Sequence, residues 1–132
     1  MPEPIWLSRI LLDQMHAELI REYGGSPGIR DANLIESALA RPRNKWLYGE
    51  EYIAELAAAY GFGLAKNHGY VDGNKRIAFM AMFVFLYQNG FFLDAPNSEV
   101  VSVMLEVTAG NLSEDALSEW IRSRMRSRHP WF

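Results

Sequence analysis

The chain has 132 residues, of which 49% are hydrophobic and 22% charged, and its formal net charge is −3 at pH 7. This length is enough for one hydrophobic core, so we expect residues 1–132 to form a single domain. The negative charge argues against general nucleic-acid binding, and the lack of cysteine excludes disulfides and thiolate chemistry.

The sequence shows no targeting or membrane signal. Its first residues have neither the basic region nor the apolar region of a signal peptide. The longest apolar run, residues 77–87, is well short of the roughly 20 residues needed to cross a bilayer. We therefore expect a cytoplasmic protein that does not associate with membranes.

Hydrophobic spacing and capping residues predict two helices in the first third of the chain. Ser8 can cap the first, and Gly24 ends it because glycine accepts the left-handed conformation that closes helices. Asp31 can cap the second, and Pro42 is expected to stop it because proline has no backbone N–H. Residues 43–49 then lack a helical pattern, so they are either a connector or a short flap that holds a partner chain.

The later elements are arranged around an unusually apolar helix. Residues 50–67 form a predicted third helix whose small side chains allow a neighbouring helix to approach closely. The fourth helix, at about residues 74–88, is apolar all round and must be surrounded on most sides. Residues 91–93 are a short extended piece, and Pro96 and Ser113 begin a fifth and a sixth helix. The expected fold is an all-α, compact single-domain bundle of about six helices around a buried central helix, with a short flap segment.

One segment before the central helix combines a titratable base, a carboxylate, an amide and two cations. The segment reads His68, Gly69, Tyr70, Val71, Asp72, Gly73, Asn74, Lys75 and Arg76. The first N–H groups of a helix have no internal partner and, with the helix dipole, favour an anion such as phosphate. Gly73 lets the backbone approach that anion, while Asp72 would repel it unless a cation such as Mg²⁺ bridges them. His68 can serve as a base near neutral pH, so the set indicates transfer of a phosphorus-centred group to a hydroxyl.

Other kinds of site fit these residues less well. A metal hydrolase would need more histidine and carboxylate ligands, and the two glycines disfavour a helix that would bring His68 and Asp72 together. A P-loop would need a fuller glycine pattern and Lys-Ser/Thr after a strand. A nucleophilic triad would need a cysteine, or a serine near His68. A purely structural glycine-rich turn remains the alternative to phosphate-directed chemistry.

Residues 68–76 resemble the Fic-family motif His-Pro-Phe-x-Asp/Glu-Gly-Asn-Gly/Lys-Arg. With Lys75 at the eighth position, the short chain and the segment at residues 28–42, the sequence resembles the Doc (death-on-curing) branch. That branch comprises the toxins of Phd–Doc-type (type II) toxin–antitoxin pairs. The likeness runs over nearly the whole chain, residues 8–120, and implies the Fic/Doc fold.

The motif departs from the family pattern at three positions. Gly69 stands where proline is usual, Tyr70 where phenylalanine is usual, and Ile77 where Doc proteins often carry threonine. We expect Tyr70 to anchor the loop in the core. Gly69 is expected to loosen the loop next to the base.

The resemblance implies a role for each polar residue of the motif. His68 would be the general base that takes the proton from the target hydroxyl, and Asp72 would bind Mg²⁺. The residues implied to hold the nucleotide are Gly73 and Asn74 as the anion cradle, with Lys75 and Arg76 on the phosphates.

The reaction that the resemblance implies depends on Lys75. Most Fic enzymes have glycine at the position of Lys75 and transfer AMP, whereas Doc proteins use Mg²⁺-ATP to phosphorylate a threonine of elongation factor Tu and so stop translation. The implied activity is therefore a protein Ser/Thr kinase, with ATP and Mg²⁺ as cofactors. Adenylyl transfer to a protein hydroxyl is one alternative, and an inactive Fic domain that acts as a binding module is another.

The resemblance also implies a Phd-like antitoxin, with a disordered segment that folds on binding. An inhibitory helix of the form Ser/Thr-x-x-x-Glu-Gly/Asn is matched only partly, because Val107 follows Ser102 and Glu106. Restraint is thus expected from another chain, near the His68 loop. The candidate surfaces are residues 45–48 and the basic tail Arg122, Arg124, Arg126 and Arg128.

Overall fold

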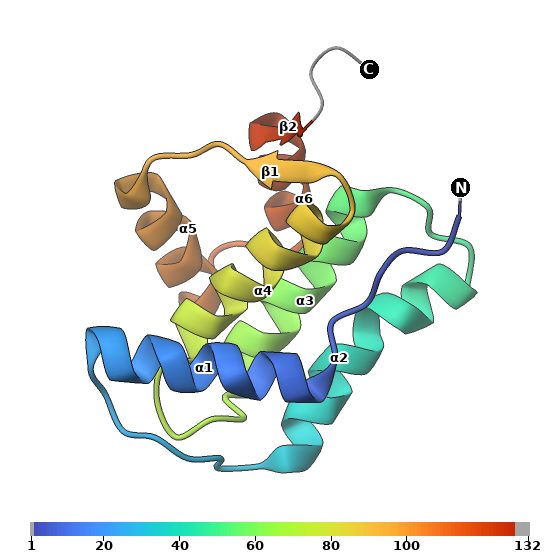
Figure 1. The fold of residues 1–132 in the computed structure, drawn as a ribbon. Helices are drawn as coiled ribbons and strands as arrows, with labels where there is room; N and C mark the ends of the chain where they lie inside the picture. The colour runs from blue at the N-terminus through green and yellow to red at the C-terminus, as the bar shows by residue number, and fades with distance from the viewer. Residues whose placement is uncertain (1, 129–132) are drawn as a thin grey trace.

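The computed structural model describes residues 2–128, drawn as a ribbon in Figure 1. Within this range the chain forms six helices and two short strands. Their bounds are α1 Arg9–Tyr23, α2 Ala32–Leu47, α3 Ile53–Asn67, α4 Asn74–Gln88, β1 Phe91–Leu93, α5 Asn97–Ala109, α6 Glu114–Arg124 and β2 Met125–Ser127. The expected all-α bundle of about six helices is confirmed.

Helices α3 and α4 form the centre of the bundle, and α4 is packed against α1, α3, α5 and β1. Ile77 and Phe85 of α4 are fully buried, as is Ala57 of α3. A Cβ added at Gly61 would lie 2.2 Å from Met82 Sδ, so glycine at this position leaves room for the Met82 side chain between the two helices. The small residues of α3 therefore allow α4 to pack closely against it at the centre of the bundle.

Helix α2 does not stop at Pro42 but continues through it to Leu47, which corrects both the predicted end and the position of the flap. Proline removes one helical hydrogen bond, but Pro42 is buried and Trp46, one turn later, packs against the core. Lys45 also forms an ion pair with Glu114 of α6. Tertiary contacts thus outweigh the helix-breaking tendency of one residue.

The short two-stranded flap is formed instead by β1 and β2, which pair antiparallel with Phe91 opposite Ser127. The extended piece at residues 91–93 was predicted, but its partner strand was not. Two arginines of the basic tail are tied to this end of the molecule. Arg124 pairs with Glu99, and the Arg128 guanidinium lies 4.0 Å from the centre of the Tyr87 ring.

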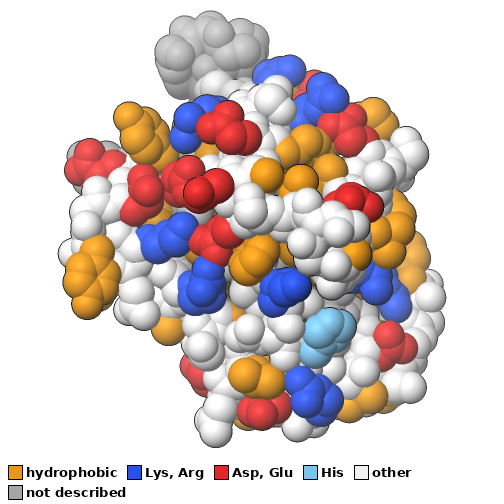
Figure 2. Space-filling model, turned by 180° about the vertical axis from the view of Figure 1, so that it is seen from behind, with side chains coloured by type: hydrophobic (Ala, Val, Ile, Leu, Met, Phe, Trp, Pro, Cys, Tyr) orange, Lys and Arg blue, Asp and Glu red, His pale blue; other side chains and the backbone are white. Residues whose placement is uncertain are grey.

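The surface carries charges of both signs. On the face shown in Figure 2, basic and acidic side chains interleave and form no single basic field. Among residues 2–128, no helix has the length and apolar character that a membrane span requires.

Candidate active site

The motif loop joins α3 to α4, and positive φ values mark both of its ends. His68 caps α3 with φ 50°, the one non-glycine residue in the left-handed region between residues 2 and 128. Gly73 caps α4 with φ 75°. Between the two turns, at the yellow-green connection in Figure 1, Val71 and Asp72 are exposed, whereas Gly69 and Tyr70 are buried. His68 is exposed, and its imidazole has no hydrogen-bond partner within the described part of the chain.

The segment between α1 and α2 holds this loop from outside. The Arg30 guanidinium donates to the carbonyl oxygens of His68, at 2.7 Å, and Asn67, at 3.1 Å. It thereby satisfies carbonyls at the C-terminal end of α3 that have no helical partner. The Val71 N–H donates to Gly28 O at 3.1 Å. The backbone beside the base is thus fixed by a segment some 40 residues earlier in the chain.

Gly69, which we expected to loosen the loop, is instead buried and closely packed. Its carbonyl oxygen accepts the N–H groups of Arg30, at 2.8 Å, and Asp31, at 2.9 Å. A Cβ added at Gly69 would lie 2.4 Å from Ile35 Cγ1. The isoleucine of α2 therefore fills the space that a larger residue at position 69 would need.

The Asp72 carboxylate is oriented by two backbone N–H groups. Ser26 N donates to Oδ2 at 3.1 Å, and Gly73 N donates to Oδ1 at 2.8 Å. These hydrogen bonds, Ser26 first, lower the pKa of Asp72 below its ordinary value. The side chain is exposed, and each of its oxygens keeps a further lone pair for a cation.

No group of three or more acidic or histidine side chains among residues 2–128 could hold a metal ion. A cation at Asp72 would therefore need most of its ligands from water and from a bound anion. Magnesium is commonly held in this way, by one or two carboxylates together with substrate phosphates and waters. The donor set thus fits Mg²⁺ that arrives with a phosphate-containing ligand.

The first turn of α4 leaves backbone N–H groups open to a ligand. Gly73 provides no side-chain cap, and the Ile77 N–H is the first to bond back, to Gly73 O at 3.0 Å. The N–H groups of residues 74–76 face outward as in any uncapped helix start. The φ of 75° favours glycine at position 73, and a Cβ there would also lie close to Ile20 Cδ1, at 3.1 Å.

The amide of Asn74 is a brace inside the loop. Its Oδ1 accepts from Tyr70 N at 3.1 Å, and its Nδ2 donates to Tyr70 O at 3.0 Å. The side chain is buried. Asn74 can therefore take part in an anion cradle only through its backbone.

The two cations of the motif lie in different surroundings. Lys75 is exposed and has no hydrogen-bond or ion-pair partner within residues 2–128. Arg76 donates to Gly24 O at 3.0 Å and more weakly to Leu19 O at 3.4 Å, and so ties down the end of α1. Lys75 is free to reach a ligand, while Arg76 is already partly engaged.

All six residues that the sequence analysis assigned to the site come together around one cavity of about 220 Å³. Its lining comprises His68, Val71, Asp72, Gly73, Asn74, Lys75 and Arg76. The cavity is smaller than the roughly 300–1,000 Å³ of pockets that enclose a whole small ligand. A cavity of this size can enclose only part of a small ligand.

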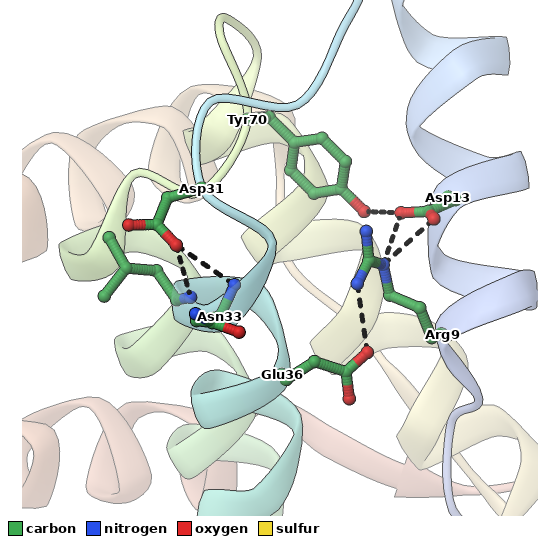
Figure 3. Close-up of polar contacts among 7 residues, drawn as sticks. Arg9, Asp13, Asp31, Asn33, Glu36 and Tyr70 are labelled. Atoms are coloured by element: carbon green, nitrogen blue, oxygen red, sulfur yellow. Dashed lines mark hydrogen bonds and ion pairs between the residues drawn. The ribbon is translucent and has the colours of Figure 1, made fainter.

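Sequence reasoning missed the residues of α1 that lie beneath the loop. Tyr70 O–H donates to Asp13 Oδ1 at 2.5 Å, as Figure 3 shows. The His16 ring stacks on the Tyr70 ring at 3.8 Å, and His16 Nε2 lies 2.7 Å from Asp72 O. The available signal was the placement of Arg9, Asp13 and His16 on one face of a helix.

Comparison with known proteins finds a family match that includes the motif loop. A model described as "Fic/DOC family" matches residues 6–86, which include α1, α2, α3, the motif loop and most of α4. Toxin Doc of Mycolicibacterium smegmatis is 43% identical over 76 residues. That alignment covers 55% of this chain and 58% of the relative, so less than two thirds of the relative is matched.

Proposed function

We propose, since this chain belongs to the Fic/DOC family, that it is a Doc-like toxin that transfers the γ-phosphoryl group of Mg²⁺-ATP to a protein hydroxyl. The proposed target is a threonine of elongation factor Tu. The observation that carries the proposal is one cavity shared by an imidazole with no hydrogen-bond partner among residues 2–128, an ionised carboxylate and an open helix N-terminus. These are the groups that such a reaction requires.

Each residue has a defined task in this reaction. The backbone N–H groups of residues 74–76 hold phosphate oxygens, and the Lys75 ammonium adds charge beside them. Mg²⁺, bound by Asp72 and phosphate oxygens, would neutralise charge on the phosphates. His68 takes the proton of the target hydroxyl, and the oxygen of that hydroxyl bonds to the γ-phosphorus. The bond from that phosphorus to the bridging oxygen breaks, and ADP leaves.

Lys75 supports phosphoryl transfer over adenylyl transfer. Its exposed side chain has no other partner among the described residues and stands in the turn that would face the phosphates. A lysine there occupies space and adds a charge that glycine would not. Adenylyl transfer uses the same base and cradle with the α-phosphorus as electrophile, so it is the alternative that must be tested.

The decisive experiment compares α- and γ-labelled ATP with elongation factor Tu as acceptor. Label from the γ-position is expected on the factor, and His68→Ala should reduce its rate about a hundredfold or more. Label from the α-position alone would replace the proposal with AMP transfer. Growth arrest that survives His68→Ala would instead point to a domain that acts by binding.

We further propose an antitoxin partner, but on a different surface from the two suggested by the sequence. Both of those surfaces lie at the far end of α3 from His68. Residues 45–48 end α2 just before α3 begins, and Arg122 lies 5.3 Å from the ring of Tyr52, which caps the start of α3. A helix of 15 residues is about 22 Å long, so neither surface adjoins the loop.

An apolar groove of about 440 Å³ between α1, α4 and α5 fits such a partner better. Its rim includes Tyr23, Val101 and Leu105, which are 68%, 58% and 48% exposed. Lys75 and Arg76 line both this groove and the smaller cavity, so an occupant would reach the catalytic loop. An amphipathic antitoxin segment with an acidic residue toward these cations matches the groove in polarity and charge.

The antitoxin proposal is tested by co-expression. The protein alone should arrest growth, and its neighbouring antitoxin gene should relieve the arrest. Leu105→Glu should keep the arrest but lose the relief, because it places a carboxylate in the apolar groove. Leu47→Glu is the matched control, since Leu47 is 76% exposed at the far end of the bundle. Harmless expression of the active protein without any partner would contradict the proposal.

A further inference from the structure

The underside of the motif loop is clamped to α1 through the side chain of Tyr70. This side chain is 2% exposed, and its hydroxyl donates to Asp13 Oδ1 at 2.5 Å. The Arg9 Nε donates to both oxygens of Asp13, at 3.0 and 2.9 Å. Arg9 Nη1 in turn donates to Glu36 of α2 at 3.0 Å. Figure 3 shows these groups converging from the loop and the two helices.

A second contact from the same face of α1 reaches Asp72. His16 is buried, and its ring lies nearly parallel to that of Tyr70, at 11° and 3.8 Å between centroids. His16 Nε2 lies 2.7 Å from Asp72 O. A carbonyl oxygen can only accept, so Nε2 carries the proton and donates.

These contacts leave the loop little freedom between its two reactive side chains. Tyr70 lies midway between His68 and Asp72, and Asn74 fixes its backbone N–H and C=O. Asp13 fixes its hydroxyl, and His16 fixes its ring. The Asp72 backbone is held by His16 on one side, and the carboxylate is held by the Ser26 and Gly73 N–H groups on the other. Displacement of the Tyr70 side chain would therefore disturb the backbone that connects the base to the carboxylate.

We propose that Asp13 and His16 are positioning residues for the proposed transfer reaction. Asp13 holds the loop through the Tyr70 hydroxyl, and His16 holds it through the Asp72 carbonyl. The consequence for catalysis rests on the function proposed above, whereas the clamp itself does not. Because a displacement of about 1 Å can cost about a hundredfold in rate, loss of the clamp should lower kcat more than it raises KM for ATP.

Amide hydrogen exchange measures how firmly the clamp holds the loop, and it does not depend on catalytic activity. Tyr70→Phe removes the hydroxyl and leaves Asp13 paired with Arg9. Exchange at the Val71 N–H, which bonds to Gly28 O, should accelerate about tenfold or more. Tyr60→Phe is the matched control, because Tyr60 is a buried tyrosine whose hydroxyl accepts from Leu7 N away from the loop. It should leave Val71 exchange unchanged relative to amides of α5.

A second pair of variants separates the hydrogen bond that His16 donates from the stacking of its ring on Tyr70. His16→Gln keeps a donor near the position of Nε2, whereas His16→Phe keeps the stacked ring and loses the donor. The glutamine variant should retain more of the kcat than the phenylalanine variant, with both remaining folded by circular dichroism. If the phenylalanine variant retained as much kcat as the glutamine variant, or more, the hydrogen bond to Asp72 O would not be what matters, and the assigned role of His16 would be overturned.

The outcomes distinguish the clamp from the reaction. Equal acceleration of exchange in the loop and in α5, or none in either, would overturn the clamp whether or not the protein uses ATP. A faster-opening loop with unchanged kcat would overturn the positioning role. If the wild-type protein transfers no phosphoryl group, the proposed function fails, and the exchange comparison still decides the clamp.

Discussion

Substitution of Gly69 by alanine tests whether Ile35 occupies the space beside the catalytic base. The added Cβ would lie 2.4 Å from Ile35 Cγ1, and also 3.2 Å from Ile35 N and 3.3 Å from Asp31 O. Because two of these neighbours are backbone atoms of α2 and its cap, the strain cannot be relieved by one side-chain rotation. Overpacking of this kind costs about 1–3 kcal/mol.

A double-mutant cycle assigns this cost to one contact. Ile35 is 1% exposed, so Ile35→Ala alone should cost about 2–5 kcal/mol through the cavity it leaves. In the Ile35→Ala background, the further cost of Gly69→Ala should fall by about 1 kcal/mol or more, because the Cγ1 is gone. The free energies come from urea unfolding at 25 °C, monitored by circular dichroism.

The control for this cycle uses another buried isoleucine. Ile121 of α6 is fully buried but lies outside the motif loop, so Ile121→Ala and Gly69→Ala should be additive within about 0.5 kcal/mol. If Gly69→Ala cost the same with and without Ile35, the packing argument would be refuted. The same result would revive the view that glycine at this position makes the loop loose.

Three further changes test the charges of the site. Hydrogen bonds lower the pKa of Asp72 in the folded state, so its ionisation stabilises the fold above about pH 4 and the contribution is lost at lower pH. The difference in urea midpoint between wild type and Asp72→Asn should therefore shrink from about pH 5 to about pH 3, and a constant difference would contradict this. Arg76→Ala should slow transfer and also cost about 1 kcal/mol in urea unfolding, because the guanidinium bonds to Gly24 O. Lys75→Gly should lose γ-label transfer and shift label toward AMP; transfer at the wild-type rate would remove the lysine from the account.

Local sequence features determined most of the helices and the site loop. Capping residues close to their helices, such as Ser8, Asp31 and Ser113, accept N–H groups within three positions, so the helix starts can be read from neighbouring residues. The uninterrupted apolar run of residues 77–87 likewise predicted that α4 is surrounded by other elements, because a helix that is apolar on all sides must be buried. The six site residues lie within nine positions, so their meeting at one cavity needed only the turn between α3 and α4. Their chemical roles stay predictions.

Contacts between distant segments decided what the sequence by itself could not. Pro42 lies inside a helix because burial and the packing of Trp46 outweigh one lost hydrogen bond. The fit of Gly69 depends on Ile35. The clamp joins Asp13 to Tyr70, 57 positions apart, and each residue taken alone resembles an ordinary helix or core residue. Helix caps and apolar periodicity act over a few residues, whereas these contacts exist only after folding has brought α1, α2 and the loop together. The support beneath the catalytic loop was therefore visible only in the tertiary structure.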